Sequence, residues 1–107
     1  MPAVGADIDH FMLDDLRIEV VGDRCQTVDG TLGGSALNMA AAVRNCVQKA
    51  GIPRDEALRM ASTYPAEYLG ISSTYGFIKP GYRANLVVMD NETVVKAVVS
   101  EGTFIEV

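Results

Sequence analysis

The sequence is poor in the residues that mark several classes of small protein: it has one histidine, two cysteines and no tryptophan among 107 residues. Two cysteines, Cys25 and Cys46, are too few for the disulfide framework of a small secreted domain, which favours a reducing cytoplasm. Catalytic zinc normally takes three protein ligands with histidine prominent, so His10 alone is a weak basis for a zinc site.

Basic residues and long apolar runs are also scarce. Nine Lys and Arg residues stand against fourteen Asp and Glu residues, giving a net charge of -5 with no basic cluster, so we expect no nucleic-acid partner. Apolar runs such as residues 39–43 and 86–89 fall far short of the roughly 20 residues that a membrane helix needs. We therefore expect no membrane span, and the first residues do not resemble a signal peptide.

What remains is the composition of one small globular domain. The chain is 49% hydrophobic and 21% charged, which is unlike a disordered segment. A chain of this length buries only about two thirds of its unfolded surface, so a thin core is expected.

The distribution of β-branched residues, glycine and proline predicts an α+β layout of strands, then helices, then strands. A hairpin is expected at 17–21 and 24–28 around Gly22, followed by a glycine-rich loop at 29–35. The apolar spacing predicts a helix over 36–50, capped by Ser35 and ended by Gly51. Further helices are expected over 53–62 and 64–70, and a three-stranded meander over 85–90, 93–100 and 103–107.

An acidic cluster near the start of the chain has two interpretations. Asp7, Asp9 and His10, with Asp14 and Asp15, could in principle ligate a cation, but a solvated acidic turn is favoured because the histidine is alone. A Ser-His-Asp triad built from this histidine is not supported, because the sequence contains no G-x-S-x-G motif.

The run Gly30-Thr31-Leu32-Gly33-Gly34-Ser35 is more informative. It is neither G-x-G-x-x-G nor a phosphate-binding P-loop, which would need a lysine. From the residues alone it is either a tight entry into the following helix or a ligand loop with closely approaching backbone.

Two further groups of residues have simple structural interpretations. Met39, Met60 and Met89 are expected to fill gaps in the core rather than to bind a metal. Tyr64 and Tyr68, four residues apart, are expected to pack as a pair, with lining of a pocket as the alternative.

Longer strings within the chain permit a comparison with a known family. The blocks at 29–39, 42–45, 51–52, 55–62 and 64–66 resemble the C-terminal portion of the N-acetylglucosamine-6-phosphate deacetylases, in the same order and spacing. The stretch 76–90 is similar to the segment by which amidohydrolases return from the barrel to a small β-domain, except that Asn85 replaces an aspartate, which we interpret as a change in a structural turn.

The resemblance implies a fold, a reaction and a substrate site. These enzymes are (β/α)8 barrels that use a divalent metal, zinc or iron, to hydrolyse the N-acetyl group and release glucosamine-6-phosphate and acetate in amino-sugar metabolism. Residues 1–75 would belong to the barrel and 76–107 to the accessory β-sandwich. Leu32, Gly33, Gly34 and Ser35 would contact the substrate, while the phosphate would be held mainly by residues elsewhere.

The family's metal ligands and catalytic aspartate precede the matched part, so we assign the chain no catalytic or metal-binding residue and expect it to be inactive alone. An uncovered apolar helix face would then associate with the rest of the barrel or with a second copy. A non-catalytic binding or assembly module derived from the same segment, or a piece of another amidohydrolase, are the alternatives.

Overall fold

The computed structural model describes residues 2–107, which fall into two compact units, Met1–Asn38 and Met39–Val107. Each unit is described separately. The order of elements is strands, helices, strands, as the sequence predicted, so the mixed α and β class is confirmed.

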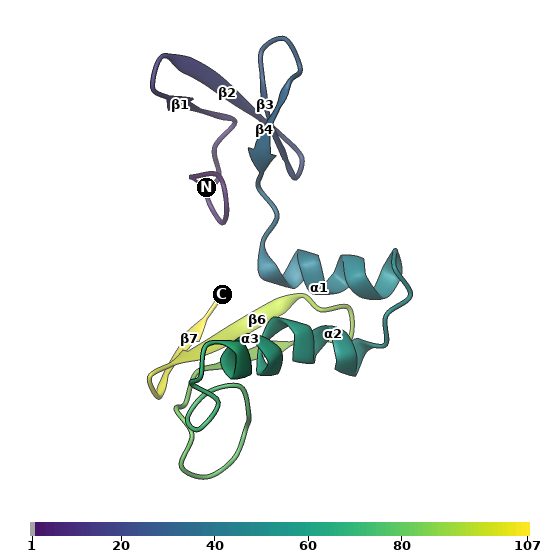
Figure 1. Ribbon diagram of the computed structural model, residues 1–107. Helices are drawn as coiled ribbons and strands as arrows, with labels where there is room; N and C mark the ends of the chain where they lie inside the picture. The colour runs from purple at the N-terminus through teal and green to yellow at the C-terminus, as the bar shows by residue number, and fades with distance from the viewer. Residues whose placement is uncertain (1) are drawn as a thin grey trace. The chain divides into compact units, whose positions relative to one another are not determined.

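The first unit is a four-stranded antiparallel sheet with the strands in sequence order (Figure 1). Its strands are β1 (His10–Leu13), β2 (Leu16–Val21), β3 (Arg24–Thr27) and β4 (Leu32–Ser35). The predicted hairpin is the β2–β3 pair, in which Val21 lies opposite Arg24 across a tight turn. Gly22 has φ +64° in this turn, a backbone conformation that glycine adopts without steric cost.

The core of the first unit is small. Ile18 and Cys25 are fully buried and pack with Ala3, and Phe11 lies against this cluster from β1. With so little apolar surface removed from water, the hydrophobic effect can contribute only a small part of what orders this unit.

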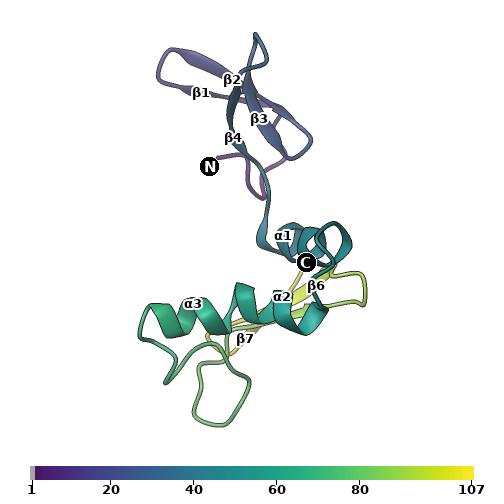
Figure 2. The same cartoon turned by 45° about the vertical axis from the view of Figure 1, so that its right-hand side comes forward.

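The second unit begins with three helices, α1 (Met39–Gln48), α2 (Arg54–Ala61) and α3 (Thr63–Tyr68). The first two run side by side in opposite directions, and α3 continues beyond α2 after a break at Ser62 (Figures 1 and 2). Pro53 is the N-cap of α2, and acidic residues in its first turn complement the helix dipole, so the proline-based prediction is confirmed within a residue.

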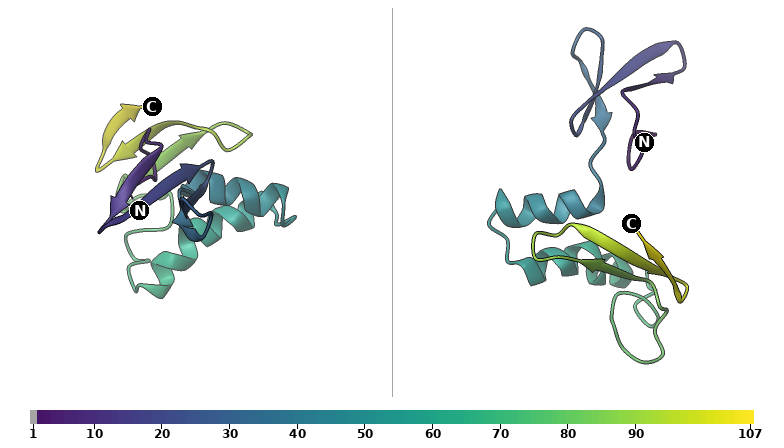
Figure 3. Two further views of the ribbon diagram at one scale, coloured as in Figure 1. Left: turned by 90° about the horizontal axis from the view of Figure 1, so that it is seen from above. Right: turned by 180° about the vertical axis from the view of Figure 1, so that it is seen from behind.

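A three-stranded antiparallel meander completes the unit: β5 (Leu86–Met89), β6 (Val95–Ser100) and β7 (Thr103–Glu106). Its strands lie alongside α2 and α3, as seen from behind in Figure 3. All three lie within the ranges that the β-branched residues predicted.

Two arginines attach the β5–β6 turn to the helices. Arg44 of α1 donates to the carbonyl oxygen of Thr93 at 3.0 Å, and Arg54 of α2 donates to that of Asp90 at 2.8 Å. Both guanidinium groups also reach a second carbonyl of the same turn. Because these bonds use backbone acceptors, they fix the path of the turn regardless of its side chains.

Several boundaries differ from the prediction. Residues 32–35, expected as part of a loop, form a strand, and β1 was not predicted at all. The first helix starts at Met39 rather than at residue 36, so Ser35 does not cap it. The Ser35 hydroxyl instead accepts from the Leu37 N–H at 3.0 Å, which belongs to the connecting segment.

The expected roles of some methionines and tyrosines were also wrong. Met39 and Met60 are exposed rather than buried in the core, whereas Met89 is half-buried. Tyr64 and Tyr68 do not pack as a pair: the Tyr64 hydroxyl donates to Glu56 at 2.8 Å, and the Tyr68 side chain is 92% exposed.

The segment before β5 is held to the β6–β7 turn by a group of hydrogen bonds. Asn85 donates to the Glu101 carboxylate at 2.8 Å and accepts from the Glu101 backbone N–H at 2.7 Å. Arg83 donates to the other carboxylate oxygen at 2.7 Å. The Asn85 amide, followed by the Arg83 charge, lowers the pKa of Glu101 below its ordinary value of 4.5.

Because this pKa is lowered on folding, the ionised Glu101 stabilises the fold above about its ordinary pKa, and this stabilisation is lost as the pH falls through the folded-state value. We predict that Asn85→Asp raises the pKa of Glu101 and lowers stability at pH 7, because a second carboxylate replaces the amide donor. The stability difference from the parent chain should shrink on acidification.

NMR titration of the Glu101 carboxyl carbon and urea unfolding at several pH values measure the two effects. Asn91→Asp, which adds the same charge in the β5–β6 turn, is the control. Combining Asn85→Asp with Glu101→Gln again pairs one side-chain amide donor with one carboxylate acceptor. The double variant should therefore recover the free energy of unfolding that the single variant loses at pH 7. An unchanged Glu101 pKa in the single variant would show that Asn85 does not tune it.

Gly76 lies where the chain passes closest to α3. Its φ is +91°, and a Cβ there would lie 3.0 Å from the Cβ of Ala66 and 3.3 Å from the Cα of Thr63. The buried Thr63 donates its hydroxyl to the Gly76 carbonyl oxygen at 3.0 Å, so a partly buried hydrogen bond fixes the approach.

We predict that Gly76→Ala lowers the free energy of unfolding by about 2 kcal/mol or more, because backbone strain and a steric clash add. Gly81→Ala is the matched control, since Gly81 has a similar φ of +87° but open space around the Cβ position. Strain alone should cost that variant about 1 kcal/mol. Equal unfolding midpoints for the two variants would contradict a clash at Gly76.

No helix within residues 2–107 is long and apolar enough to cross a membrane.

Candidate functional site

The four residues predicted to contact substrate, Leu32, Gly33, Gly34 and Ser35, form β4 at the edge of the first unit's sheet. Its inner edge pairs with β3, and no further strand pairs with its outer edge in the described part of the chain. An edge strand presents unpaired N–H and C=O groups. The structure thus places a row of backbone donors and acceptors where the sequence suggested a ligand loop.

A β-bulge lies in the middle of this strand. Cys25 of β3 is opposite Gly34 and Gln26 is opposite Leu32, so Gly33 is the extra residue without a partner. Bulges bend a strand and occur often next to active sites, where they redirect groups. A Cβ on Gly33 would meet the Ile18 side chain at 3.4 Å, so this backbone lies directly on the buried core.

The exposed side of β4 is partly apolar. The Leu32 side chain is 66% exposed, and the backbone around both glycines carries no side chain to keep a ligand at a distance. Backbone hydrogen-bonding groups with an apolar side chain beside them suit a neutral polar ligand.

The C-terminal end of β4 is tied to the β2–β3 turn. The Ser35 hydroxyl donates to the carbonyl oxygen of Asp23 at 3.1 Å, and the Ala36 N–H donates to the same oxygen at 2.9 Å. With the Leu37 N–H bonded to it as well, the Ser35 hydroxyl has two partners within the chain. Its main task in this structure is therefore to hold the strand end.

The N-terminal end is tied by the β3–β4 turn. The Thr27 hydroxyl donates to the Asp29 carboxylate and accepts from the Thr31 N–H at 3.1 Å. The Thr31 hydroxyl donates to the other Asp29 carboxylate oxygen at 3.2 Å. The Thr27 hydroxyl, followed by the Thr31 N–H, lowers the pKa of Asp29 below its ordinary value of 3.8, so Asp29 is an ionised acceptor at neutral pH.

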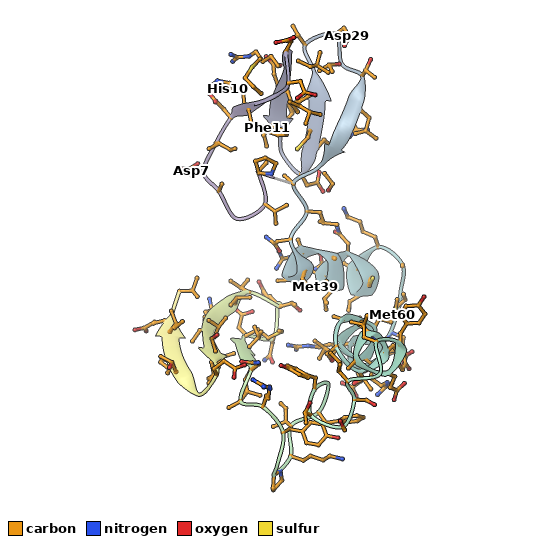
Figure 4. The ribbon with its side chains drawn as sticks, turned by 60° about the vertical axis from the view of Figure 1, so that its left-hand side comes forward. Asp7, His10, Phe11, Asp29, Met39 and Met60 are labelled. Atoms are coloured by element: carbon orange, nitrogen blue, oxygen red, sulfur yellow. The ribbon has the colours of Figure 1, made fainter. Side chains whose placement is uncertain are left out.

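Asp29 does not join the acidic cluster predicted near the start of the chain (Figure 4). Asp29 lies at the tip of the β3–β4 turn, away from Asp7 and His10. His10 begins β1 and is hydrogen-bonded to its neighbour Asp9, whose pKa is lowered chiefly by that bond. The predicted solvated acidic turn is confirmed for Asp14 and Asp15, which are exposed in the turn between β1 and β2, whereas His10 is exposed at the start of β1.

The second unit contains an apolar groove of about 510 Å³ between its helices and sheet. Its polar residues are already engaged: Arg54 holds the β5–β6 turn, while Arg83 and Asn85 hold Glu101. The groove thus offers apolar packing surface rather than catalytic groups, and its apolar lining includes Met39, Val43, Leu58, Phe77, Val87 and Val98.

Residues 16–105 match the Amidohydrolase family, which is most of the chain. The chain belongs to this family. Among solved structures, N-acetylglucosamine-6-phosphate deacetylase from Pasteurella multocida superposes with a TM-score of 0.88 at 39% identity, covering 97% of this amidohydrolase chain and 27% of that one. The Mycobacterium smegmatis deacetylase, solved as a mutant in complex with N-acetyl-D-glucosamine-6-phosphate, gives 0.77 at 33%, covering 100% and 29%.

In sequence, an N-acetylgalactosamine-6-phosphate deacetylase of Escherichia coli O157:H7 is 36% identical over 102 residues, or 95% of the chain and 27% of that protein. A shorter relative of the same kind in Escherichia coli strain K12 is also 36% identical over 102 residues, which are 95% of this chain and 61% of that protein. The amidohydrolase chain therefore spans only part of its relatives, about a quarter in most of these cases.

Amidohydrolases are generally metal-dependent, so we tested whether residues of this chain could hold a metal. Within residues 2–107, no group of three or more His, Cys, Asp or Glu side chains lies close enough to ligate an ion. The described residues do not fit a metal centre by themselves, and we derive no reaction step through a metal from them.

Sequence reasoning named Thr31 only as a member of the glycine-rich run and missed Thr27, so the bonds between these two residues were not predicted. Their signal was the spacing Thr27-x-Asp29-x-Thr31 directly before the glycines. Hydroxyl and carboxylate side chains two residues apart often bond each other and the local backbone, and such a pattern marks a turn with a fixed shape.

Proposed function

We propose that this chain is the C-terminal part of an N-acetylglucosamine-6-phosphate deacetylase and that Leu32, Gly33, Gly34 and Ser35 contact the sugar. The observation that carries the proposal is the 0.88 TM-score at 39% identity to a deacetylase of that name, over 97% of the chain. The mutant deacetylase complex with N-acetyl-D-glucosamine-6-phosphate supports the substrate.

The reaction is hydrolysis of an amide. Water adds to the acetyl carbonyl carbon, the carbonyl–nitrogen bond breaks, and the nitrogen leaves with a proton as the amine of glucosamine-6-phosphate while the acetyl group departs as acetate. The contribution of β4 is to bind and orient the sugar through its free edge, with Leu32 against an apolar part of the substrate.

The groups that activate water lie outside this chain in our proposal. The complete enzyme would hold zinc or iron and a catalytic aspartate in the part of the barrel that precedes the matched segment. The 107-residue chain alone is then inactive, because hydrolysis needs both an activated water and a proton acceptor within reach.

We propose the division that the family resemblance implies. Residues 1–75 would belong to the barrel and 76–107 would form strands of the accessory β-sandwich; this division differs from the two compact units of the structure, which meet at residues 38 and 39. The apolar groove and the exposed valines of β5 support association with the remaining barrel or with a second copy of the chain. The enzyme would act in the cytoplasm, in amino-sugar metabolism.

A chimera tests the proposed function. This chain replaces the corresponding C-terminal segment of the Pasteurella multocida deacetylase, and acetate release is measured with N-acetylglucosamine-6-phosphate and, separately, N-acetylgalactosamine-6-phosphate. We predict turnover of the glucosamine derivative, because this chain supplies the same sugar-contacting strand. Turnover of the galactosamine derivative only would contradict the substrate, and a folded chimera inactive on both would contradict the function.

Leu32→Ala in the chimera tests the assigned site. We predict a KM raised about three- to tenfold, because a large part of an apolar contact is lost. Val28→Ala is the matched control, since Val28 is 70% exposed in the neighbouring turn and lies outside β4. Equal KM values for both variants would contradict contact between Leu32 and the sugar.

A further inference from the structure

The buried core cannot by itself fix the conformation of β4. Ile18 and Cys25 are the large fully buried side chains of the first unit, and they belong to β2 and β3, not to β4. Of the β4 residues, only Gly34 is even half-buried, and neither glycine has a side chain that packing could hold. The edge position removes a second neighbouring strand as well.

Besides the pairing with β3, hydrogen bonds at the two ends of the strand set its path, and the two ends differ in kind. At the Ser35 end, the carbonyl oxygen of Asp23 collects two donors, one of them a backbone N–H that any residue would supply. At the Thr31 end, the bonds depend on three side chains. Thr27 connects them, because its hydroxyl bonds both Asp29 and the Thr31 N–H.

The backbone bonds of this turn lie around the same threonine. The Thr27 N–H donates to the Thr31 carbonyl oxygen at 2.9 Å, and the Gly30 N–H donates to the Thr27 carbonyl oxygen at 2.9 Å. The bulge at Gly33 begins two residues beyond Thr31. Leu32 is the one residue between Thr31 and the bulge. A change in the conformation of the turn therefore reaches the two glycines of β4 almost directly.

We propose that Thr27 is a positioning residue for substrate binding, holding β4 in its binding conformation through Asp29 and Thr31. It does not touch the sugar in this account; it fixes the edge that does. The claim that Thr27 affects substrate binding rests on the proposed function. The claim that Thr27 holds the conformation of β4, the structural half of the proposal, concerns the 107-residue chain alone.

Two measurements separate these halves. The first is amide hydrogen exchange, measured by NMR at the N–H groups of Leu32 and Gly34 in the 107-residue chain. Neither of these N–H groups bonds the Thr27 hydroxyl. Steady-state kinetics on the Pasteurella multocida chimera give KM and kcat for N-acetylglucosamine-6-phosphate. The variants are Thr27→Val, which removes only the hydroxyl, and Thr27→Ser, which keeps it.

We expect Thr27→Val to speed exchange at both amides about fivefold, and to raise KM about fivefold with kcat within twofold, because a bond that orders the ground-state site is lost. Thr27→Ser should restore the parent values. Thr103→Val, the same substitution in β7, is the control. It should leave hydrogen exchange at the Leu32 and Gly34 amides, KM and kcat unchanged. Unchanged amide shifts outside residues 24–35 verify the fold.

Other results overturn the idea. Unchanged exchange at Gly34 in Thr27→Val shows that the threonine does not hold the strand. Faster exchange with an unchanged KM shows a purely structural role. If Thr27→Val does not fold, Asp29→Ala replaces it, because that change removes the carboxylate that accepts from the Thr27 and Thr31 hydroxyls. An inactive parent chimera overturns the proposed function, and the exchange data then still decide the structural half.

Discussion

The Thr27 hydroxyl, shared between a carboxylate and a backbone N–H, is the interaction on which the candidate site depends. The first unit has few buried side chains, so its edge strand must be held by directional bonds rather than by packing. A strand built largely of glycine gains close approach for a ligand and loses the side chains that would anchor it. The short polar turn before β4 supplies the missing constraint.

The second unit solves a similar problem with arginine. Arg44 and Arg54 reach across from two helices to the carbonyl groups of one turn, and Glu101 gathers Arg83 and Asn85 at the other end of the sheet. Between these attachments the helices and the sheet leave an apolar groove. This unit is thus held by polar contacts at its two ends, and the groove between them is lined mainly by apolar side chains.

The sequence predicted those elements whose local chemistry is unambiguous. Pro53 with two acids located α2, and runs of β-branched residues located the final meander. It failed at β4, because glycine-rich runs favour turns unless tertiary pairing overrides them, and pairing with Cys25 is not visible locally. The residues that we propose to contact substrate come from the family resemblance, whereas the bulge at Gly33 and the bonds made by the threonines required the three-dimensional arrangement.

A crystal structure of the chimera with N-acetylglucosamine-6-phosphate bound tests the central claim most directly. The account predicts sugar density against the open edge of β4, within hydrogen-bond distance of backbone atoms of residues 32–35 and in contact with the Leu32 side chain. A bound sugar that makes no contact with residues 32–35 would contradict it, and β4 would then be only the edge of a small sheet.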